Sequence, residues 1–250
     1  TVVQPPNPAY SGHLADTNTF AAHEAGFTGR GVRIGFIDSG VNRRHPALRD
    51  RVVANLVYIG PGNNLSVDDV SGHGTAVAQI AAGRPFGTWP GGVAQNAEIV
   101  SARIIGDKPP EDDGSGAGNE IDGPLGLEPI HRDLINRNVK VMNNSWGGLY
   151  WTNLAVTAQI AAEYRPFIVN HGGLVVFASG NAGFASPTDT AALPSKQGTG
   201  GSLPAADLER GWITVSALAE GSTTALASYS NACGVAMRYC LVAPGTVIVT

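Results

Sequence analysis

The sequence of 250 residues has little charge of either sign. Asp, Glu, Lys and Arg make up only 14% of it, and the net charge at pH 7 is −4. Nucleic acids and anionic membrane surfaces are bound mainly through clustered basic residues, so we expect neither as the main partner. We expect a substrate to be recognised by shape and by hydrogen bonds instead.

Long apolar runs are also missing. No stretch reaches the roughly 18 consecutive apolar residues that a membrane span needs, and no basic segment followed by an apolar one opens the chain at Thr1. We therefore expect no transmembrane segment in this chain, and we expect any targeting segment to have been removed. The hydrophobic content of 43%, without a long polar tract, predicts one large folded domain over residues 1–250.

Cysteine is scarce, and the two that are present lie close together at Cys233 and Cys240. An even, local pair is typical of a disulfide formed in an oxidising compartment. Two free buried thiols are the alternative interpretation. Two cysteines at this spacing, with no further paired ligands nearby, do not indicate a zinc site.

Glycine and proline are abundant, with 33 and 16 residues, which favours an α/β fold with long surface loops over a helical bundle. Apolar runs alternate with helical patterns along the chain. We expect strands over residues 32–37, 97–105, 139–143, 173–178, 212–217 and 240–243, and helices over 16–25, 72–82, 126–138 and 153–168. This order predicts a mostly parallel central sheet flanked by helices, with the site at the carboxyl ends of the strands.

Polar residues with catalytic potential follow several of these strands. Asp38 comes directly after the first strand, Ser145 and Asn181 follow later strands, and His73 lies in the first turn of the helix over 72–82. Each signal is weak alone, because an aspartate after a strand is often a turn former and a histidine near a helix start is often a capping neighbour. Their shared position at one predicted edge of the sheet makes them a candidate site.

Four short motifs, in their order along the chain, resemble the signatures of the subtilisin-like serine proteases. They are Ile-Asp-Ser-Gly-Val at 37–41, Ser-Gly-His-Gly-Thr at 71–75, Asn-Ser-Trp-Gly-Gly at 144–148 and Ala-Ser-Gly-Asn-Ala-Gly at 178–183. The resemblance runs from about Ala22 to Thr250 and includes Val-Ala-Pro-Gly at 242–245. It implies a subtilisin-like fold and a serine endopeptidase that acts on proteins or peptides.

The chemistry of such an enzyme assigns a role to each catalytic candidate. A serine hydroxyl is a weak nucleophile, so a neutral imidazole must take its proton, and His73 is the candidate base. A buried carboxylate on the other ring nitrogen fixes the tautomer, and Asp38 is the candidate. The resemblance implies that Asn181 donates to the oxyanion. The alternative is that Asn181 only adopts a left-handed turn.

The resemblance also implies substrate-binding residues, which are Ser145, Trp146, Gly147, Ala178, Ser179 and Gly180. The first three would pair with the peptide as an added strand, and the last three would form one wall of the pocket for the residue before the cleaved bond. Trp146 is equally well interpreted as a core aromatic. Residues 114–116, Gly-Ser-Gly, match the opposite edge of the substrate cleft poorly.

The departure from the family pattern is the nucleophile. The sequence contains no Gly-Thr-Ser segment, and no serine sits in a Gly-x-Ser-x-Gly elbow. We expect the serine beyond Thr250, with residues 1–250 as the larger N-terminal part of the protease domain and a companion C-terminal fragment, or an unbroken continuation, carrying it. The alternative is a non-catalytic binding or scaffold protein. Nucleotide binding is disfavoured, because no Gly-rich fingerprint follows the first strand.

No cofactor is required by this chemistry, and no metal-binding residue is assigned. Calcium stays open, because residues 107–122 are rich in Asp and Glu, although a solvated acidic loop is the favoured interpretation. The segments around Cys233 and Cys240 resemble those of the autotransporter subgroup of Gram-negative bacteria. That resemblance implies a secreted or cell-surface protein.

Overall fold

The computed structural model describes residues 8–108 and 119–249. The chain forms two compact units, one of residues 1–109 with 246–250 and one of residues 110–245. Each unit contains its own set of parallel strands, and the sequence motifs are divided between them.

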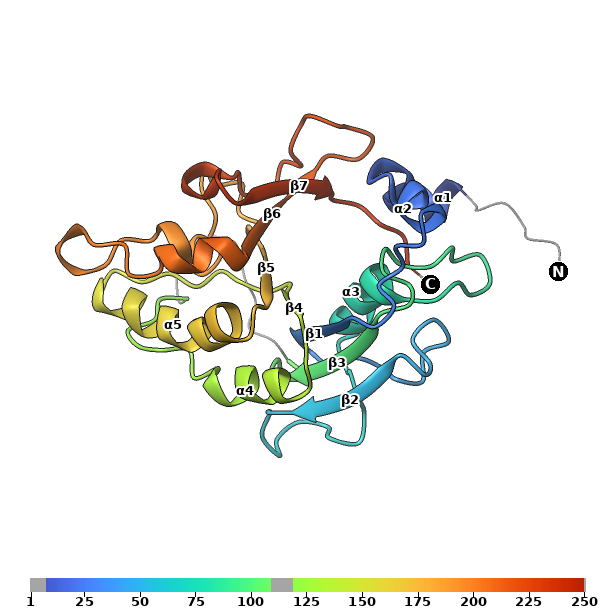
Figure 1. Ribbon diagram of the computed structural model, residues 1–250, viewed down its shortest axis with the longest axis horizontal. Helices are drawn as coiled ribbons and strands as arrows, with labels where there is room; N and C mark the ends of the chain where they lie inside the picture. Colours follow the sequence, from blue (N-terminus) through green and yellow to red (C-terminus); the bar gives the residue numbers. More distant parts are fainter. Residues whose placement is uncertain (1–7, 109–118, 250) are drawn as a thin grey trace. The chain divides into compact units, whose positions relative to one another are not determined.

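The first unit contains a three-stranded parallel arrangement in the order β2-β3-β1 (Figure 1). Its strands are β1 (Arg33–Asp38), β2 (Val52–Val57) and β3 (Glu98–Arg103), and its helices are α1 (Pro8–Asp16), α2 (Thr19–Glu24) and α3 (His73–Ala82). β1 is a buried run, with Phe36 and Ile37 fully inaccessible. Helix α3 packs against β1 and β3 through small residues, and its Ala78 and Ala82 are fully buried. The register pairs Asp38 with Arg103, so both lie at the carboxyl ends of their strands.

Two features of the first unit differ from the sequence prediction. The helix expected over 16–25 is present as the shorter α2, because Asn18 adopts a left-handed conformation with φ of 55° just before it, and α1 was not predicted. Strand β2 was not predicted. It lies at the end of the strand order in this unit and is half-buried along most of its length, so its sequence lacks the continuous apolar run of an inner strand.

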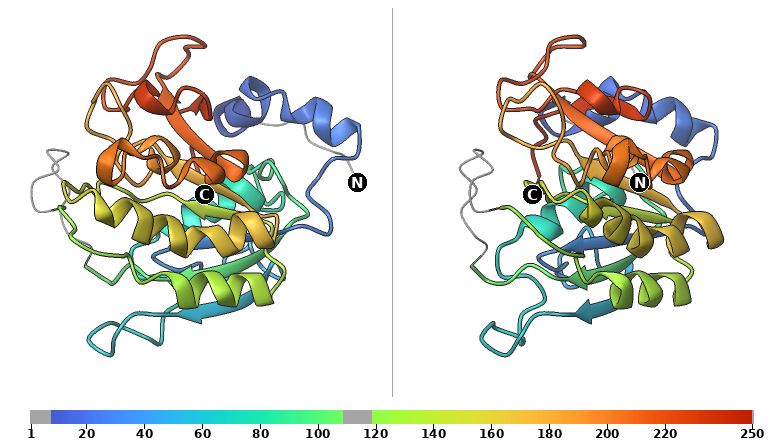
Figure 2. Two further views of the ribbon diagram at one scale, coloured as in Figure 1. Left: turned by 60° about the vertical axis from the view of Figure 1, so that its left-hand side comes forward. Right: turned by 90° about the vertical axis from the view of Figure 1, so that its left-hand side faces the viewer.

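The second unit contains four parallel strands in the order β4-β5-β6-β7. The strands are β4 (Val141–Asn144), β5 (Leu174–Ala178), β6 (Trp212–Leu218) and β7 (Cys240–Pro244), and the helices are α4 (Glu128–Asn136) and α5 (Ala155–Arg165). Helices α4 and α5 lie side by side (Figure 2). The remaining helical turns are a π turn at Pro166–Asn170 and 3-10 turns at Leu193–Ser195, Thr199–Gly201, Ala206–Gly211 and Gly234–Ala236.

Aromatic side chains fill the core of the second unit. Phe177 on β5 stacks on Trp212 of β6 with ring centroids 5.3 Å apart, and Tyr164 of α5 meets Trp212 edge-on at 5.1 Å. The buried Glu163 carboxylate accepts the backbone N–H groups of Leu125 and Leu127, which satisfies donors at the start of α4. Burial raises the pKa of this carboxyl, although the N–H donors oppose the shift.

These observations confirm the predicted α/β class with parallel strands and flanking helices. The predicted strands and helices are all present, with boundaries that differ by a few residues. Within residues 8–108 and 119–249, no helix is both long enough and apolar enough to cross a membrane.

Candidate active site

The structure brings Asp38 and His73 together in the first unit. Asp38 ends β1 and is fully buried, and His73 begins α3 with about half of its side chain exposed. His73 Nδ1 lies 2.7 Å from Asp38 Oδ1, and because a carboxylate only accepts, the imidazole donates this hydrogen bond. This bond fixes the tautomer and leaves Nε2 as the basic nitrogen of the neutral ring.

The surroundings of His73 favour its protonated form more than water would. The hydrogen bond to Asp38 raises the pKa of His73 above its ordinary value of 6.5, burial opposes the rise, and the negative charges of Asp38 and Asp69 add to it. A base with a raised pKa takes a proton more readily, so the geometry suits general-base chemistry.

Backbone packing leaves the Asp38–His73 pair little freedom to move. A Cβ atom on Gly74 would come within 2.1 Å of the Gly40 carbonyl oxygen and 3.1 Å of Asp38 Oδ1, so only glycine fits after His73. Ser39 N donates to Asp38 Oδ1 at 2.6 Å. Asp38 Oδ2 is buried without a hydrogen-bond partner among the described residues, so the carboxylate depends on its Oδ1 contacts.

Arg103 is a buried cation in the first unit that the sequence analysis missed. Its side chain is 1% exposed, and its guanidinium donates to the carbonyl oxygens of Asn64 and Val67 and to Asp107 Oδ1. It therefore anchors the loop over residues 58–70 that leads toward His73. A single arginine at the end of an apolar strand was the available signal, but its carbonyl partners at Asn64 and Val67 lie 39 and 36 residues away and cannot be read from local sequence.

The predicted oxyanion donor lies in the second unit. Asn181 is exposed and follows Gly180, whose φ of 116° is open to glycine but strained for other residues. The loop over residues 179–184 is held by Asn231, which is fully buried. Asn231 Oδ1 accepts the N–H groups of Ala182 and Phe184 at 3.1 and 2.9 Å, so it binds the backbone that follows Asn181.

Further bonds fix the start of the same loop. Asn231 Nδ2 donates to the Ser179 carbonyl oxygen at 3.1 Å, and Asn231 N donates to the Gly180 carbonyl oxygen at 2.9 Å. A Cβ atom on Gly180 would lie 2.5 Å from Asn231 Nδ2, so the glycine is needed for this close approach. The sequence analysis missed Asn231, because only the tertiary fold brings it to a loop about 50 residues earlier.

The proposed substrate-binding segments occupy the carboxyl ends of neighbouring strands. β4 and β5 pair in parallel with Asn144 opposite Phe177, so the chain after Asn144 and the chain after Ala178 leave the strands at the same edge. This part of the convergence predicted from sequence is confirmed within the second unit. Trp146, which follows β4, is half-buried and meets Phe177 edge-on with centroids 5.3 Å apart, so it contributes to the core. A role at a substrate subsite stays a prediction.

The two cysteines are joined in a disulfide. Cys233 and Cys240 are bonded, and neither is a free thiol. The bridge connects the turn after Asn231 to the first residue of β7. This observation decides between the two interpretations that the sequence left open.

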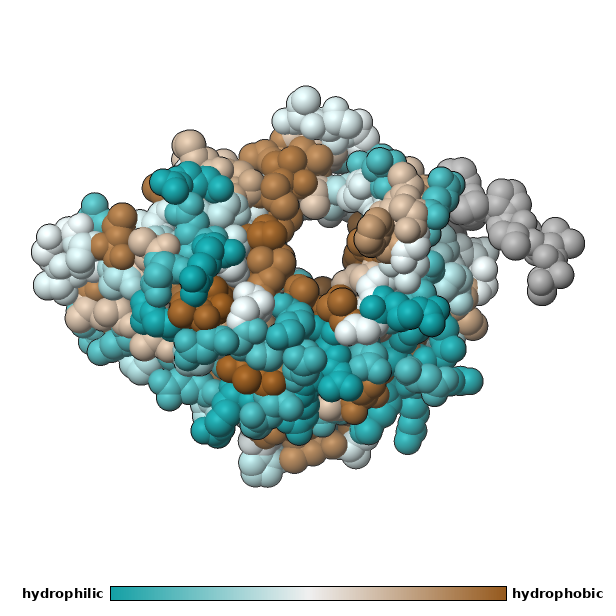
Figure 3. Space-filling model, in the orientation of Figure 1, coloured by the Kyte–Doolittle hydropathy of each residue, from teal (hydrophilic) through white to brown (hydrophobic). Residues whose placement is uncertain are grey.

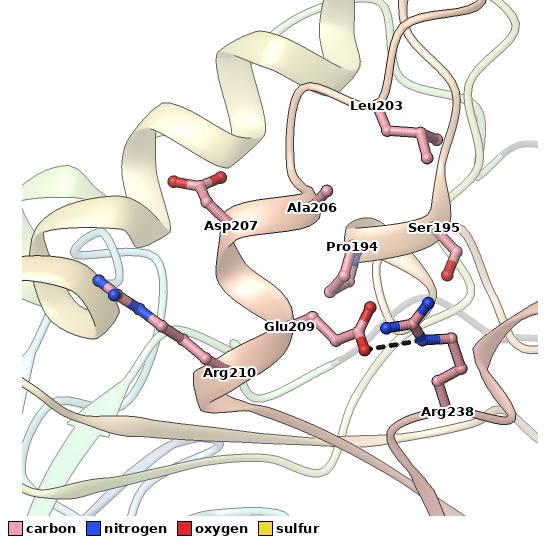
Figure 4. A pocket seen from close by; sticks show the side chains of 8 residues that line it. All are labelled: Pro194, Ser195, Leu203, Ala206, Asp207, Glu209, Arg210 and Arg238. Carbon is pink, nitrogen blue, oxygen red and sulfur yellow. Dashed lines mark hydrogen bonds and ion pairs between the residues drawn. The ribbon is translucent and has the colours of Figure 1, made fainter.

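A surface depression of about 680 Å3 lies in the second unit, away from the loop that carries Asn181 (Figure 4). It is lined by Pro194, Ser195, Leu203, Ala206, Asp207, Glu209, Arg210 and Arg238. These residues precede β6 and β7, so the depression lies at the amino ends of these strands. Its charges include the ion pair of Glu209 with Arg238, and Asp207 pairs with Arg165. The depression therefore lies at the end of the strands opposite to the end where the loop with Asn181 begins.

Metal ligands do not cluster in the described part of the chain. Across residues 8–108 and 119–249, no group of three or more His, Cys, Asp or Glu side chains is arranged to hold a metal ion. Most of the acidic insertion, including Glu111, Asp112 and Asp113, lies outside the described residues, and so does the Gly-Ser-Gly segment at 114–116. Calcium binding by the insertion therefore stays a prediction.

Comparisons with known proteins agree with the motifs. The subtilase family matches residues 29–249. The chain is 31% identical to Subtilisin E of Bacillus subtilis (strain 168) over 176 residues, which are 70% of this chain and 41% of that protein. It is 34% identical to an alkaline protease of Alkalihalobacillus alcalophilus over 166 residues, 66% of this chain and 38% of that protein. The aligned regions thus span about two fifths of the length of these relatives.

Solved structures show the same fold. A cold adapted subtilisin-like serine proteinase is similar with a TM-score of 0.58 and 25% identity, covering 88% of this chain and 65% of that one. A mutant of the protease domain of PatA is similar with a TM-score of 0.63 and 21% identity, covering 87% of this chain and 68% of that one. The match of the family over almost the whole chain, together with the paired Asp38 and His73, shows that this protein belongs to the subtilase family.

Proposed function

We propose that this chain is the larger, N-terminal part of the protease domain of a secreted serine endopeptidase, with His73 as general base, Asp38 as its orienting carboxylate and Asn181 as an oxyanion donor. The observation that carries the proposal is the 2.7 Å bond between His73 Nδ1 and the fully buried Asp38. A half-exposed imidazole on a buried carboxylate has one nitrogen occupied and the other available for proton transfer.

The reaction follows from these groups. A serine hydroxyl attacks the peptide carbonyl while His73 Nε2 takes its proton, and the imidazolium that forms is stabilised by Asp38. The Asn181 side-chain amide donates to the oxygen that becomes negative in the tetrahedral intermediate. His73 then returns the proton to the leaving amine, which completes acyl transfer, and water repeats the sequence to release the second product.

Substrate binding rests on the two segments of the second unit. An extended peptide would add as a strand along Ser145, Trp146 and Gly147, and Ala178, Ser179 and Gly180 would form one wall of the pocket. Both segments leave β4 and β5 at the same edge, which supports this assignment. Recognition through backbone hydrogen bonds tolerates many sequences, which fits the low charge of the chain.

The nucleophilic serine is proposed to lie in a further segment, either joined to this chain or as a companion fragment that stays associated with it. Exposed apolar residues on β7 support such a covering segment. Leu241 and Val242 are 58% and 48% exposed, and as neighbours in a strand they point to opposite faces of the sheet. Figure 3 shows apolar residues gathered at the surface over β7.

An extracellular or cell-surface location is supported by the disulfide, since such bonds persist in oxidising compartments. Assignment to the autotransporter subgroup stays a proposal that rests on the sequence around these cysteines.

The test is peptide hydrolysis by the full-length protein, with a fluorophosphonate as inhibitor and His73→Ala as a matched variant. We expect hydrolysis that the inhibitor abolishes and that His73→Ala lowers by several orders of magnitude. A full-length protein that folds but neither cleaves peptides nor reacts with the inhibitor would favour the alternative, a non-catalytic binding or scaffold protein.

A further inference from the structure

The loop that leads into α3 is built around one carboxylate, that of Asp69. Its Oδ1 accepts the Gly72 N–H at 2.9 Å and the Ser39 hydroxyl at 3.0 Å. Its Oδ2 accepts both the N–H and the hydroxyl of Thr75, at 2.9 and 2.5 Å. Asp69 therefore binds the residue before His73 and the second residue after it.

These contacts replace an ordinary helix cap. Gly72 is the N-cap position of α3, with φ of 82°, and it has no side chain to satisfy the free N–H groups of the first turn. Asp69 accepts one of them, from Thr75, and places a negative charge at the positive end of the helix. The orientation of the first turn, and of His73 within it, thus depends on Asp69.

A second path leads from Asp69 to the partner of His73. Ser39 Oγ donates to Asp69 Oδ1 and accepts the Gly74 N–H at 3.0 Å, and Ser39 N donates to Asp38 Oδ1 at 2.6 Å. One carboxylate is therefore connected to both sides of the Asp38–His73 bond. We propose that Asp69 is a positioning residue, which holds Asp38 and His73 in hydrogen-bonding register through Ser39 and through the first turn of α3.

The neighbouring carboxylate shows that this role is specific to Asp69. Asp68 accepts from the Arg43 guanidinium at 2.8 Å and from Asn55 Nδ2 at 2.9 Å. It thus ties the loop after β1 to β2, and among the described residues none of its side-chain bonds reaches the first turn of α3. Asp68 and Asp69 are both half-buried, so Asp68→Asn is a control matched in residue type and position.

The effect on catalysis rests on the proposed function, but the effect on the pair itself does not. In the full-length protein labelled with 15N-histidine, we expect wild type to show a low-field Nδ1–H resonance of His73 and a titration above pH 6.5. Asp69→Asn is expected to weaken or shift that resonance and to lower the titration midpoint. Ser39→Ala, which changes no charge, is expected to perturb the resonance, and Ser39→Thr to restore it. Asp68→Asn is expected to leave both signals as in wild type.

Kinetics add a second readout. We expect Asp69→Asn to lower kcat by about 10-fold or more with KM nearly unchanged, since small misplacements of catalytic groups are costly. Asp68→Asn should stay within about 2-fold of wild type for both constants. Thermal unfolding of each variant separates misplacement from loss of fold, and Ser39→Ala carries the test if Asp69→Asn does not fold.

Unchanged His73 signals in folded Asp69→Asn would overturn the proposal. So would a lowered titration midpoint in Asp69→Asn with an unperturbed Nδ1–H resonance in Ser39→Ala, because Asp69 would then act through its charge alone. If the signals change as expected but wild type cleaves no peptide, the positioning role stands and the proposed function fails.

Discussion

The loop that carries His73 and the loop that carries Asn181 are each held by one polar side chain, but the two side chains differ in charge. In the first unit the carboxylate of Asp69 binds the backbone on either side of His73. In the second unit the neutral amide of Asn231 binds the backbone on either side of Asn181, at the Ser179 carbonyl before it and at the N–H groups of Ala182 and Phe184 after it. The first residue lies four positions before the group that it holds, and the second lies 50 positions after it.

This difference matches the charge that each loop would meet during the proposed reaction. His73 becomes positive when it takes a proton, so a nearby carboxylate stabilises the product of that step. Asn181 would face a developing oxyanion, where a buried carboxylate would be repulsive. An amide supplies both donor and acceptor without charge, and the fully buried Asn231 uses both.

The largest effect is expected when the charged partner of His73 is removed. Asp38→Asn in the full-length protein replaces the acceptor for His73 Nδ1–H and reverses the preferred tautomer. We expect kcat to fall by on the order of 10⁴, a figure known for serine-protease triads in general and not calculated from this geometry. Steady-state kinetics with a peptide substrate measure it, and circular dichroism confirms the fold. A variant that retains near-normal turnover would remove Asp38 from the catalytic assignment.

A smaller effect is expected when the neutral amide that holds the Asn181 loop is removed. Asn231→Ala leaves the N–H groups of Ala182 and Phe184 without their partner and removes one of the two donors to the Ser179 carbonyl, so the free energy of unfolding should fall by about 3 kcal/mol. Urea denaturation measures the loss, and hydrogen exchange should show faster exchange at Ala182 and Phe184.

The exposed residue Asn170 provides the matched control, since Asn170→Ala should change stability by less than about 0.5 kcal/mol. Asn231→Asp sharpens the comparison, because a buried carboxylate should destabilise the loop increasingly as pH rises through its raised pKa. Equal stability of Asn231→Ala and wild type would show that the loop does not depend on this amide.

The disulfide provides a third comparison, because it closes the segment that runs from the turn after Asn231 to β7. Replacing both cysteines, as Cys233→Ser with Cys240→Ser, should lower the free energy of unfolding by ~2.5 kcal/mol in the chain-entropy account of a short loop. Chemical denaturation of the double variant measures it. Intact mass without reductant should be two hydrogens lower than with it, and titration of two thiols in the native protein would refute the bridge.

The smallest expected effect is the pH dependence of stability that comes from the Asp38–His73 pair. The pKa of His73 is raised in the folded protein, chiefly by its bond to Asp38, above the value of 6.5 expected when unfolded. Its stabilising contribution should be complete below about pH 6.5 and be lost as pH rises through the folded pKa. Unfolding measured from pH 5 to 9 should show this loss, and His73→Gln should not. A loss on the acidic side instead would mean that the imidazole is held neutral.

How far the sequence predicts these regions depends on how local their determinants are. β1 is an almost continuously buried apolar run, and in β5 and β6 buried residues alternate with half-buried ones, so the sequence pattern identified all three strands. Asp38 and His73 could be predicted because short motifs surround them. Strand β2 could not be predicted, because Asn55 interrupts its apolar sequence and none of its residues is fully buried.

Asn231 and Asp69, which hold the loops of Asn181 and His73, could not be predicted from sequence for a different reason. Asn231 stands in no motif with Asn181, and its amide reaches the loop only through the packing of the second unit. Asp69 lies close to His73 in sequence, but its link to Ser39 spans 30 residues and depends on how β1 and α3 meet. Motifs thus identify the groups that are proposed to react, whereas only the fold identifies the groups that are proposed to position them.

The most direct test of the account is to map where a fluorophosphonate attaches in active, full-length material. We expect one label per molecule, on a serine outside residues 1–250 in a Gly-Thr-Ser segment, and we expect His73→Ala to abolish labelling. Digestion and mass spectrometry identify the modified residue, and a denaturing gel shows whether it lies on the same polypeptide or on an associated fragment. A label on a serine within residues 1–250, or labelling that His73→Ala leaves unchanged, would contradict the account.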